Sequence, residues 1–258
     1  MTLLSFRESI CSGATLLGGF VFSTDPNITE IYAAAGFDFV IVDLEHTMND
    51  LQIVASHLRA ARAAGIQAVV RIGRSQLHDV PRLLDAGCKC LMLPHLGLPQ
   101  YGAEEALRVM RYAPRGERPT CTGVPAAEFG ISSFADYVQR SNNEVSAIGL
   151  VEDKVCVDNI DQILDAGLVD CVMPGPGDLS VSYGVHGQFT HPLVQQAIKT
   201  VIDAAKRRQI AAGLYIADPS EVARGLAMGF SVFVLSIDYK LLGATLRSAT
   251  ARMREQVR

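Results

Sequence analysis

The sequence contains no tryptophan, no cluster of basic residues and no long apolar run. A membrane-spanning helix takes about 18 or more consecutive apolar residues, so we expect no membrane partner. The formal net charge is −4, with lysine and arginine scattered along the chain. This pattern disfavours a nucleic-acid groove or an anionic membrane surface and favours a small-molecule partner.

The first 13 residues lack the basic start and apolar centre of a signal peptide, so a cytoplasmic location is expected. Six cysteines are scattered through the chain, which favours reduced buried thiols over a disulfide framework. Cys88 and Cys90 are predicted to alternate on one strand face. Because no second Cys/His pair stands at ligand spacing, they do not predict a zinc site.

Short apolar runs alternate with segments of helical periodicity along the whole chain, the pattern of repeated β-α units. At 258 residues, the length matches the ~250 residues typical of a (β/α)8 TIM barrel. We therefore predict that residues 1–258 form one such barrel. The predicted strands are Leu16–Phe22, Phe37–Asp43, Gln67–Ile72, Cys88–Pro94, Ser146–Val151, Asp170–Pro174, Ala211–Ile216 and Phe230–Ser236. The helices are expected to begin near Pro26, Asn49, Gln76, Tyr101, Val155, Pro192, Pro219 and Asp238.

A doubly wound open sheet is the alternative, but the Gly-rich nucleotide-binding motifs that usually mark it are missing. One long gap between strands, Arg111 to Glu144, is rich in proline and glycine and contains a short helical stretch near Phe134–Asn142. We interpret it as a functional loop insertion rather than a separate domain.

The second predicted strand ends abruptly in charge. Phe39–Val42 are apolar without alternation, as in a strand covered on both faces, and Asp43, Glu45 and His46 follow. Barrels place their ligands at this carboxyl end of the strands. Asp43 is predicted to hold the His46 ring in the tautomer needed for acid-base work near neutrality. The alternative is that Asp43 or Thr47 caps the next helix.

Other polar residues are predicted at the same mouth: Arg71 after strand three, Glu152 after strand five and Asp178 after strand six. Two carboxylates without neighbouring Cys or His suit Mg²⁺ or Mn²⁺. The alternatives are a solvated Glu152 at a helix start, a capping Asp178 and a structural ion pair for Arg71. Gly175 and Gly177 let the backbone approach a ligand and offer N–H groups to a carboxylate.

Several separate motifs occur in the order seen in one known family. They are Gly36 to His46, Val70 with Arg71, Leu84 to Gly87, Met92 to Pro94, Arg111 to Gly116, Val151 with Glu152, Gly175 to Ser180, and His191 with Pro192. Together they resemble the HpcH/HpaI aldolase family over almost the whole chain. The resemblance implies a pyruvate-type (β/α)8 barrel that cleaves 4-hydroxy-2-oxo acids to pyruvate and an aldehyde. It further implies a divalent metal (Mg²⁺, Mn²⁺ or Co²⁺) and a homo-trimer or homo-hexamer that exchanges the last helix.

The resemblance also implies roles for single residues. Glu152 and Asp178 would be the metal ligands, His46 with Asp43 the acid-base pair, and Arg71 the contact to the keto or enolate oxygen. Asp85 would reach the network around the catalytic histidine. Gly175 and Gly177 would receive the pyruvate carboxylate, and Phe20 would contact substrate. Apart from the resemblance, Leu214 and Tyr215 are predicted, like Phe20, to be apolar residues at the mouth that contact a neutral or hydrophobic acceptor. The loop Arg118–Phe134 departs from the family pattern and is expected to influence the choice of aldehyde.

Three other functions stay open at this point. The same enolate chemistry would decarboxylate oxaloacetate. A Schiff-base aldolase needs a lysine with a depressed pKa in the mouth, and Lys154 is the candidate. A non-catalytic barrel would use its carboxylates as caps and ion pairs.

A metal site at Glu152 and Asp178 predicts that Mg²⁺ or Mn²⁺ raises the melting temperature, because a ligand at 100 times its Kd adds about 2.7 kcal/mol of stability. Thermal unfolding with and without metal measures this rise. Glu152→Gln and Asp178→Asn should each abolish it, and an undiminished rise in both variants would contradict the site.

Overall fold

The protein folds as a closed barrel of eight parallel strands in the order β1 to β8, with β8 pairing back to β1. The computed structural model describes residues 4–98, 100 and 102–257. The predicted (β/α)8 barrel is therefore confirmed, and the open sheet is wrong. The strands are β1 Leu16–Val21, β2 Phe39–Asp43, β3 Gln67–Arg71, β4 Cys90–Leu93, β5 Ser146–Val151, β6 Cys171–Pro174, β7 Ala211–Ile216 and β8 Val232–Ile237.

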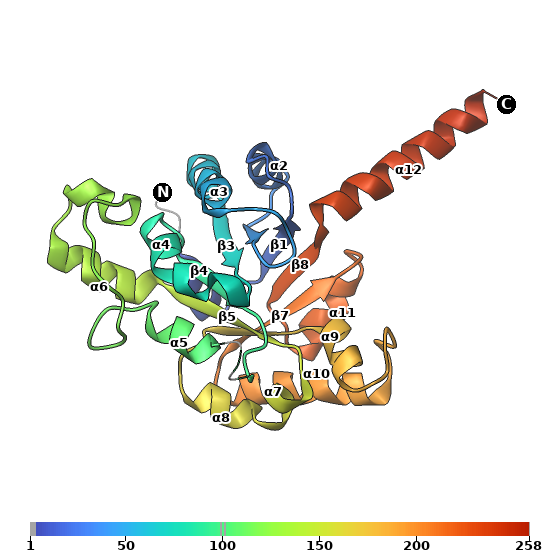
Figure 1. Ribbon diagram of the computed structural model, residues 1–258. Helices are drawn as coiled ribbons and strands as arrows, with labels where there is room; N and C mark the ends of the chain where they lie inside the picture. The colour runs from blue at the N-terminus through green and yellow to red at the C-terminus, as the bar shows by residue number, and fades with distance from the viewer. Residues whose placement is uncertain (1–3, 99, 101, 258) are drawn as a thin grey trace.

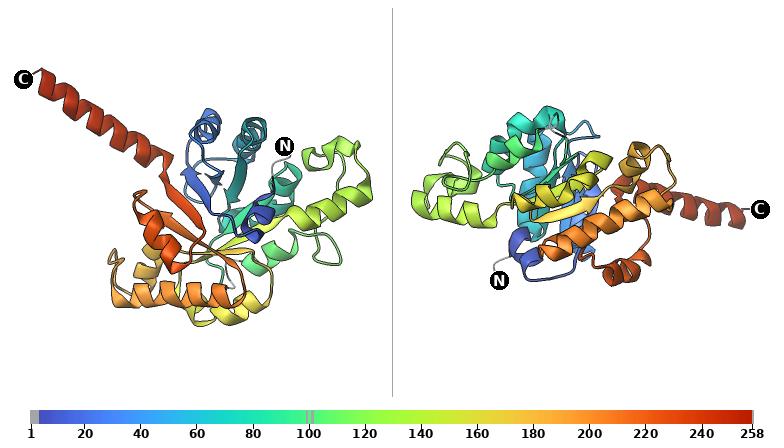
Figure 2. Two further views of the ribbon diagram at one scale, coloured as in Figure 1. Left: turned by 180° about the vertical axis from the view of Figure 1, so that it is seen from behind. Right: turned by 90° about the horizontal axis from the view of Figure 1, so that it is seen from below.

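Helices cover the outside of the barrel (Figures 1 and 2). The expected start at Tyr101 lies outside the described residues, and the helix there runs from Ala103. None of the described helices is long and apolar enough to cross a bilayer. The helices are α1 Phe6–Cys11, α2 Asn27–Ala34, α3 Leu51–Ala64, η1 Arg74–Asp79, α4 Val80–Asp85, α5 Ala103–Arg108, η3 Pro125–Gly130, α6 Phe134–Glu144, α7 Lys154–Asp158, α8 Ile160–Asp165, α9 Pro176–Ser182, α10 Pro192–Arg207, α11 Glu221–Met228 and α12 Asp238–Gln256.

Side chains of alternate strand positions fill the barrel, as the two-residue period of a strand requires. In β2, for example, Phe39 and Ile41 belong to the inner cluster, whereas Val40 and Val42 pack under the outer helices. Because both faces of β2 are covered, its apolar residues need no polar alternation. Helix α1 closes the amino end of the barrel, where Phe6 meets the Phe39 ring edge-on at 5.3 Å.

The prediction that Cys88 and Cys90 share one face of strand four is wrong. Lys89 lies between them, before β4, and pairs with Glu144 at 2.8 Å. Cys88 also precedes β4 and packs in the outer cluster, whereas Cys90 packs inside the barrel, so the two thiols do not share a face. The short turn before β4 leaves strand geometry, and a two-residue period does not extend across it.

The long insertion between β4 and β5 contains the expected short helix, which is α6. The insertion lies on the side of the barrel where β3 and β4 begin, since Pro125 and Phe129 share a cavity with Gln67 and Cys90. Within one chain the loop Arg118–Phe134 therefore does not border the mouth, and the expected influence on the choice of aldehyde stays a prediction. Its anchor is Arg118, whose buried guanidinium donates to Asp85 at 2.7 Å and stacks 4.7 Å over the Tyr112 ring.

Helix α12 projects away from the barrel (Figure 1). It begins at Asp238, directly after β8 ends at Ile237. Near this end β8 contains an extra residue relative to β1, and Ser236 has a φ of 47°. Such a bulge bends a strand and redirects the residues after it. The Asp238 carboxylate then accepts hydrogen bonds from the backbone N–H groups of Phe22 and Ser23.

Candidate active site

A buried ion pair organises the mouth of the barrel. Asp43 at the end of β2 and Arg71 at the end of β3 are register partners, and Arg71 Nε donates to Asp43 Oδ1 at 2.6 Å. Asp43 is fully buried. Its carboxylate also accepts the backbone N–H groups of Glu45 at 3.2 Å and His46 at 3.0 Å. Asp43 therefore holds both the arginine and the loop that follows β2.

The expected contact between Asp43 and the His46 ring is wrong. Asp43 bonds the backbone of His46, while the imidazole lies 3.6 Å from Glu45 Oε2 and is 63% exposed. The alternative in which Asp43 caps the next helix is also wrong, because Asp50 caps α3 by accepting from Gln52 and Ile53. The sequence placed Asp43 and His46 at the mouth correctly, but a three-residue spacing does not reveal which atoms of His46 meet the carboxylate.

Phe20 lies beneath the Arg71 guanidinium, whose central carbon stands 4.6 Å from the ring centroid. A cation over an aromatic face is stabilised by the quadrupole of the ring. Phe22 adds a second ring at 6.0 Å. Together with Asp43, these contacts fix the arginine in one orientation, so Phe20 lies at the mouth as expected.

Leu214 does not face the mouth, so its prediction as a substrate contact is wrong. It packs outward, where its side chain lies beside Gly225 of α11. The next residue, Tyr215, joins the inner cluster and stands 6.4 Å from the Phe20 ring. Because strand side chains alternate, only one of two adjacent residues can face inward, and of this predicted pair it is Tyr215.

Glu45 is a mouth residue whose role the sequence did not reveal. Its carboxylate lies 3.5 Å from Arg71 Nε and is mostly buried. Burial raises the pKa of Glu45, and the charges of Arg71 and His46 oppose that rise. The sequence did contain a signal for this role, because Glu45 stands between Asp43 and His46, which were both predicted at the mouth.

Glu152 is buried at the end of β5, so its interpretation as a solvated residue is wrong. Its Oε2 accepts the backbone N–H of His95 at 3.1 Å. Burial raises the pKa of Glu152 to about 7, and the nearby charges of Asp178 and Glu45 add to the effect. Asp153 is the residue that caps α7, by accepting from Cys156.

Gly175 and Asp178 belong to the start of α9. The N-cap of this helix is Gly175, so the alternative that Asp178 serves as the cap is wrong. A side chain at Gly175 would meet the Glu152 Cγ at 2.7 Å, so glycine makes room for the glutamate. The Gly175 N–H already bonds the Val151 carbonyl at 2.9 Å. It is therefore not available to an anion, whereas Gly177 lies in the first helical turn, whose N–H groups have no partner within the helix.

Within a single chain, two of the candidate residues do not contribute to this site. Asp85 ends α4 near the start of β4 and pairs with Arg118, so the expected link to the histidine network is not made. Lys154 starts α7 with an exposed side chain, which does not give the desolvation that a Schiff-base lysine needs.

The donor set suits a hard divalent cation. Glu152 and Asp178 both offer carboxylate oxygens, and their proximity to Glu45 concentrates negative charge that a cation would stabilise. No group of three or more His, Cys, Asp or Glu in a metal-binding arrangement exists among the described residues. A pair of carboxylates leaves the remaining positions of a bound cation to water and substrate oxygens, as Mg²⁺ commonly prefers.

The chain is thus an eight-stranded parallel barrel with an arginine and several carboxylates at the carboxyl end of its strands, the end where enzymes of this fold have their active sites. The chain belongs to the HpcH/HpaI aldolase/citrate lyase family, whose model matches residues 16–244. The predicted family is therefore confirmed.

Relatives match along nearly their whole length. The chain is 32% identical over 256 residues to a hydroxypyruvate/pyruvate aldolase of Roseovarius nubinhibens, covering 97% of this chain and 96% of the relative. It is 31% identical over 252 residues to a 4-hydroxy-2-oxo-heptane-1,7-dioate aldolase of Shigella sonnei, covering 98% and 95%. A solved structure of a family member from Burkholderia cenocepacia superposes with a TM-score of 0.88 at 33% identity, covering 96% and 98%. These relatives support the predicted class, an aldolase of the aldehyde-lyase type.

The raised pKa of Glu152 predicts how the stability of the metal-free protein depends on pH. The folded state binds this proton more tightly than the unfolded chain, where the pKa is 4.5, so stability falls as pH rises from about 4.5 through about 7. The loss should reach about 3 kcal/mol. Urea unfolding at pH 5 and pH 8 in EDTA measures it.

Glu152→Gln should flatten this dependence, whereas Glu104→Gln, at an exposed position of α5, should leave it unchanged. An equal fall in stability in the wild type and in Glu152→Gln would show that another group is responsible.

Proposed function

We propose that the protein is a class II pyruvate aldolase that cleaves a 4-hydroxy-2-oxo acid to pyruvate and an aldehyde. The observation that carries this proposal is the Arg71 guanidinium, held by Asp43 at 2.6 Å and backed by Phe20, at the same mouth as buried Glu152. A fixed cation beside a carboxylate pair suits a substrate that develops negative charge on an oxygen.

Glu152 and Asp178 would hold the divalent cation, which when bound would act as a Lewis acid on the 2-oxo acid. Neither residue would serve as the acid-base group in this assignment. Asp178 is exposed at the mouth, while Glu152 is anchored by the His95 N–H. Gly175 has no side chain that would displace Glu152 from this position.

Arg71 would stabilise the enolate oxygen of pyruvate as the C3–C4 bond breaks. Its Nε is used by Asp43, so its terminal nitrogens are the donors that remain for a substrate. Phe20 and Asp43 fix the guanidinium before the substrate arrives, so little reorganisation is required at the moment of reaction. The substrate carboxylate would dock at the first turn of α9, near Gly177, where helix N–H groups favour an anion.

His46 would take the proton from the C4 hydroxyl, directly or through a water, and return it in the addition direction. The exposed imidazole lies 3.6 Å from Glu45 Oε2, which would orient the ring. Asp43 would act on His46 through its backbone, by holding the loop at the His46 N–H. This makes Asp43 a positioning residue rather than a proton acceptor.

We further propose that the protein is a homo-oligomer assembled through α12, as a trimer or hexamer. Leu242, Leu246 and Met253 on α12 are each more than half exposed. On the barrel, Leu17 of β1, which pairs with Phe233 of β8, is also exposed, as is Ile31 of α2. Apolar patches on both parts favour contact between subunits.

Leu242→Lys combined with Leu246→Lys should therefore give a smaller sedimentation coefficient than the wild type. Leu193→Lys, on α10 and also exposed, is the control and should leave assembly unchanged. If the double variant sediments as the wild type does, α12 is not the assembling helix. Analytical ultracentrifugation makes the comparison.

The proposed chemistry predicts that the protein exchanges the methyl protons of pyruvate with D2O when Mg²⁺ or Mn²⁺ is present. Proton NMR follows the loss of the methyl signal, and EDTA should stop it. Arg71→Ala should slow exchange by about 10²–10³, as removal of one oxyanion contact does in comparable sites. Arg71→Lys should recover only part of the rate, because lysine keeps the charge but loses the planar fork.

When no aldehyde is bound, His46 would take the C3 proton of pyruvate itself and return a deuteron from D2O, so His46→Ala should slow the exchange as well. His186→Ala, on an exposed loop, is its matched control. Circular dichroism confirms that each variant folds. Folded wild type that shows no exchange with either metal would refute pyruvate enolisation at this site.

A further inference from the structure

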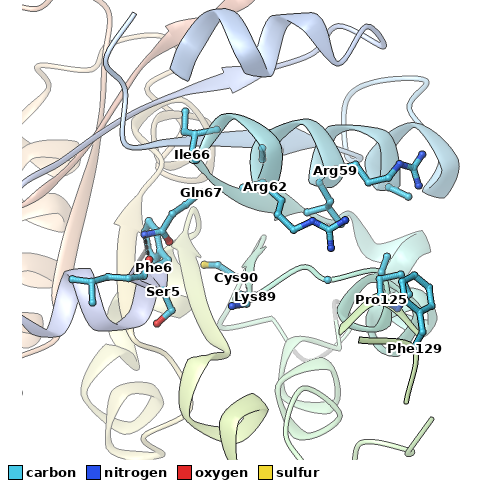
Figure 3. Close-up of a pocket in the computed structure, with 18 residues that line it drawn as sticks. Ser5, Phe6, Arg59, Arg62, Ile66, Gln67, Lys89, Cys90, Pro125 and Phe129 are labelled. Carbon is cyan, nitrogen blue, oxygen red and sulfur yellow. Dashed lines mark hydrogen bonds between the residues drawn. The ribbon is translucent and has the colours of Figure 1, made fainter. Parts of the chain in front are cut away.

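A cavity of about 640 Å³ lies at the amino end of the barrel, opposite the mouth. Helices α1 and α3 and the starts of β3 and β4 surround it, and the insertion between β4 and β5 covers one side (Figure 3). Its volume is in the range of sites for small organic ligands. None of the residues assigned to the aldolase site lines it.

Two arginines give one wall of this cavity a positive charge. Arg59 and Arg62 stand three residues apart on α3, and hence on neighbouring positions of one helix face. Arg59 donates to Ser56 Oγ at 3.0 Å, and in the described part of the chain neither guanidinium forms an ion pair. Figure 3 shows Arg62 extending from α3 toward the side where Lys89 and Pro125 lie.

The charge of Lys89 is already balanced. Its Nζ lies 2.8 Å from Glu144, so the unbalanced positive charge is concentrated on the α3 wall. This wall is an exception in a chain whose formal net charge is −4. Guanidinium groups bind carboxylate and phosphate oxygens through paired N–H donors, which favours an anion at this wall.

The interior of the cavity is apolar. Phe6, Leu58, Ile66 and Cys90 line it, and each is less than a tenth exposed. Burial raises the pKa of Cys90 well above its usual value, so its thiol stays neutral and adds no reactive group. The lining therefore suits the binding of an apolar body, not a second catalytic centre.

The insertion holds an aromatic ring at the rim. Glu128 and Phe129 have φ values of 52° and 57°, in the left-handed region that glycine favours. Phe129 is nonetheless 68% exposed, so burial of the ring does not offset this strain. Backbone strain at an exposed aromatic residue is typical of a segment shaped for contact with a ligand.

We propose that this cavity binds a small amphipathic anion. Its carboxylate or phosphate head would pair with Arg59 and Arg62, and its apolar body would lie between the buried lining and Phe129. The positive wall, the apolar interior and the exposed ring each match one part of such a molecule. This site is separate from the aldolase site and does not depend on the assigned activity.

Phe129→Trp provides a local probe, because the sequence contains no tryptophan. Titration of this single-tryptophan protein with octanoate should give a saturable change in fluorescence. Octyl phosphate in a parallel titration shows which head group binds more tightly. Octanol has the tail without the charge and inorganic phosphate the charge without the tail, so both should bind at least tenfold more weakly than the tighter amphiphile.

Arg59→Gln with Arg62→Gln in the Phe129→Trp background should raise the Kd of that amphiphile at least tenfold and leave octanol binding unchanged. The charge-matched control combines Lys199→Gln with Arg224→Gln, on exposed parts of α10 and α11, and should keep the original Kd. Equal affinities in the arginine variant and the control would overturn the proposal. So would the absence of any saturable change with either amphiphile, and sedimentation at the same protein concentration would then show whether a second copy covers the cavity.

Discussion

The ion pair between Asp43 and Arg71 is the contact on which the mouth depends. Both residues leave water, and such a pair is stable only if the remaining hydrogen-bonding positions are used. The structure meets this condition with the N–H groups of Glu45 and His46 on one side and the Phe20 ring on the other. Loss of one partner would leave a buried charge, which typically costs 3–5 kcal/mol. The arginine, the β2 loop and the aromatic base are therefore one unit rather than three independent features.

The carboxyl and amino ends of the barrel differ in the residues that they present. At the carboxyl end, β2 and β3 stop in Asp43 and Arg71 and Glu152 directly follows β5, so these charged side chains share the mouth of the barrel. At the amino end, α1 and the insertion cover the strands, and Arg118 ties the insertion to α4 by donating to Asp85 of α4 and to Ser141 of the insertion's own helix α6. A long insertion can vary at this end without disturbing the residues that face the substrate.

Much of the architecture could be predicted because strand periodicity is local. The eight strands, the helix α6 and the mouth positions of Asp43, Arg71 and Glu152 all follow from short patterns read along the chain. The predictions failed where a shift of one residue decides which side of a strand a side chain faces, or where a group already has a hydrogen-bond partner. Leu214 points outward because Tyr215 points inward, and the Gly175 N–H is used by Val151. Asp85 looked like part of the site from its motif, but its helix brings it to the insertion. Such outcomes depend on three-dimensional neighbours that local sequence does not specify.

The chain passes from β8 directly into α12. In a β-α unit the chain must reverse direction before the helix can lie back along its own strand, and here no residues stand between Ile237 and Asp238 to make that reversal. Over its 19 residues α12 extends outward, a reach of about 28 Å at 1.5 Å per residue. The same absent turn creates an unpaired helix and an uncovered sector of the barrel wall. Every subunit has one such helix and one such sector. In a closed ring of subunits, the helix of each subunit can therefore cover the sector of the next, and no sector stays uncovered.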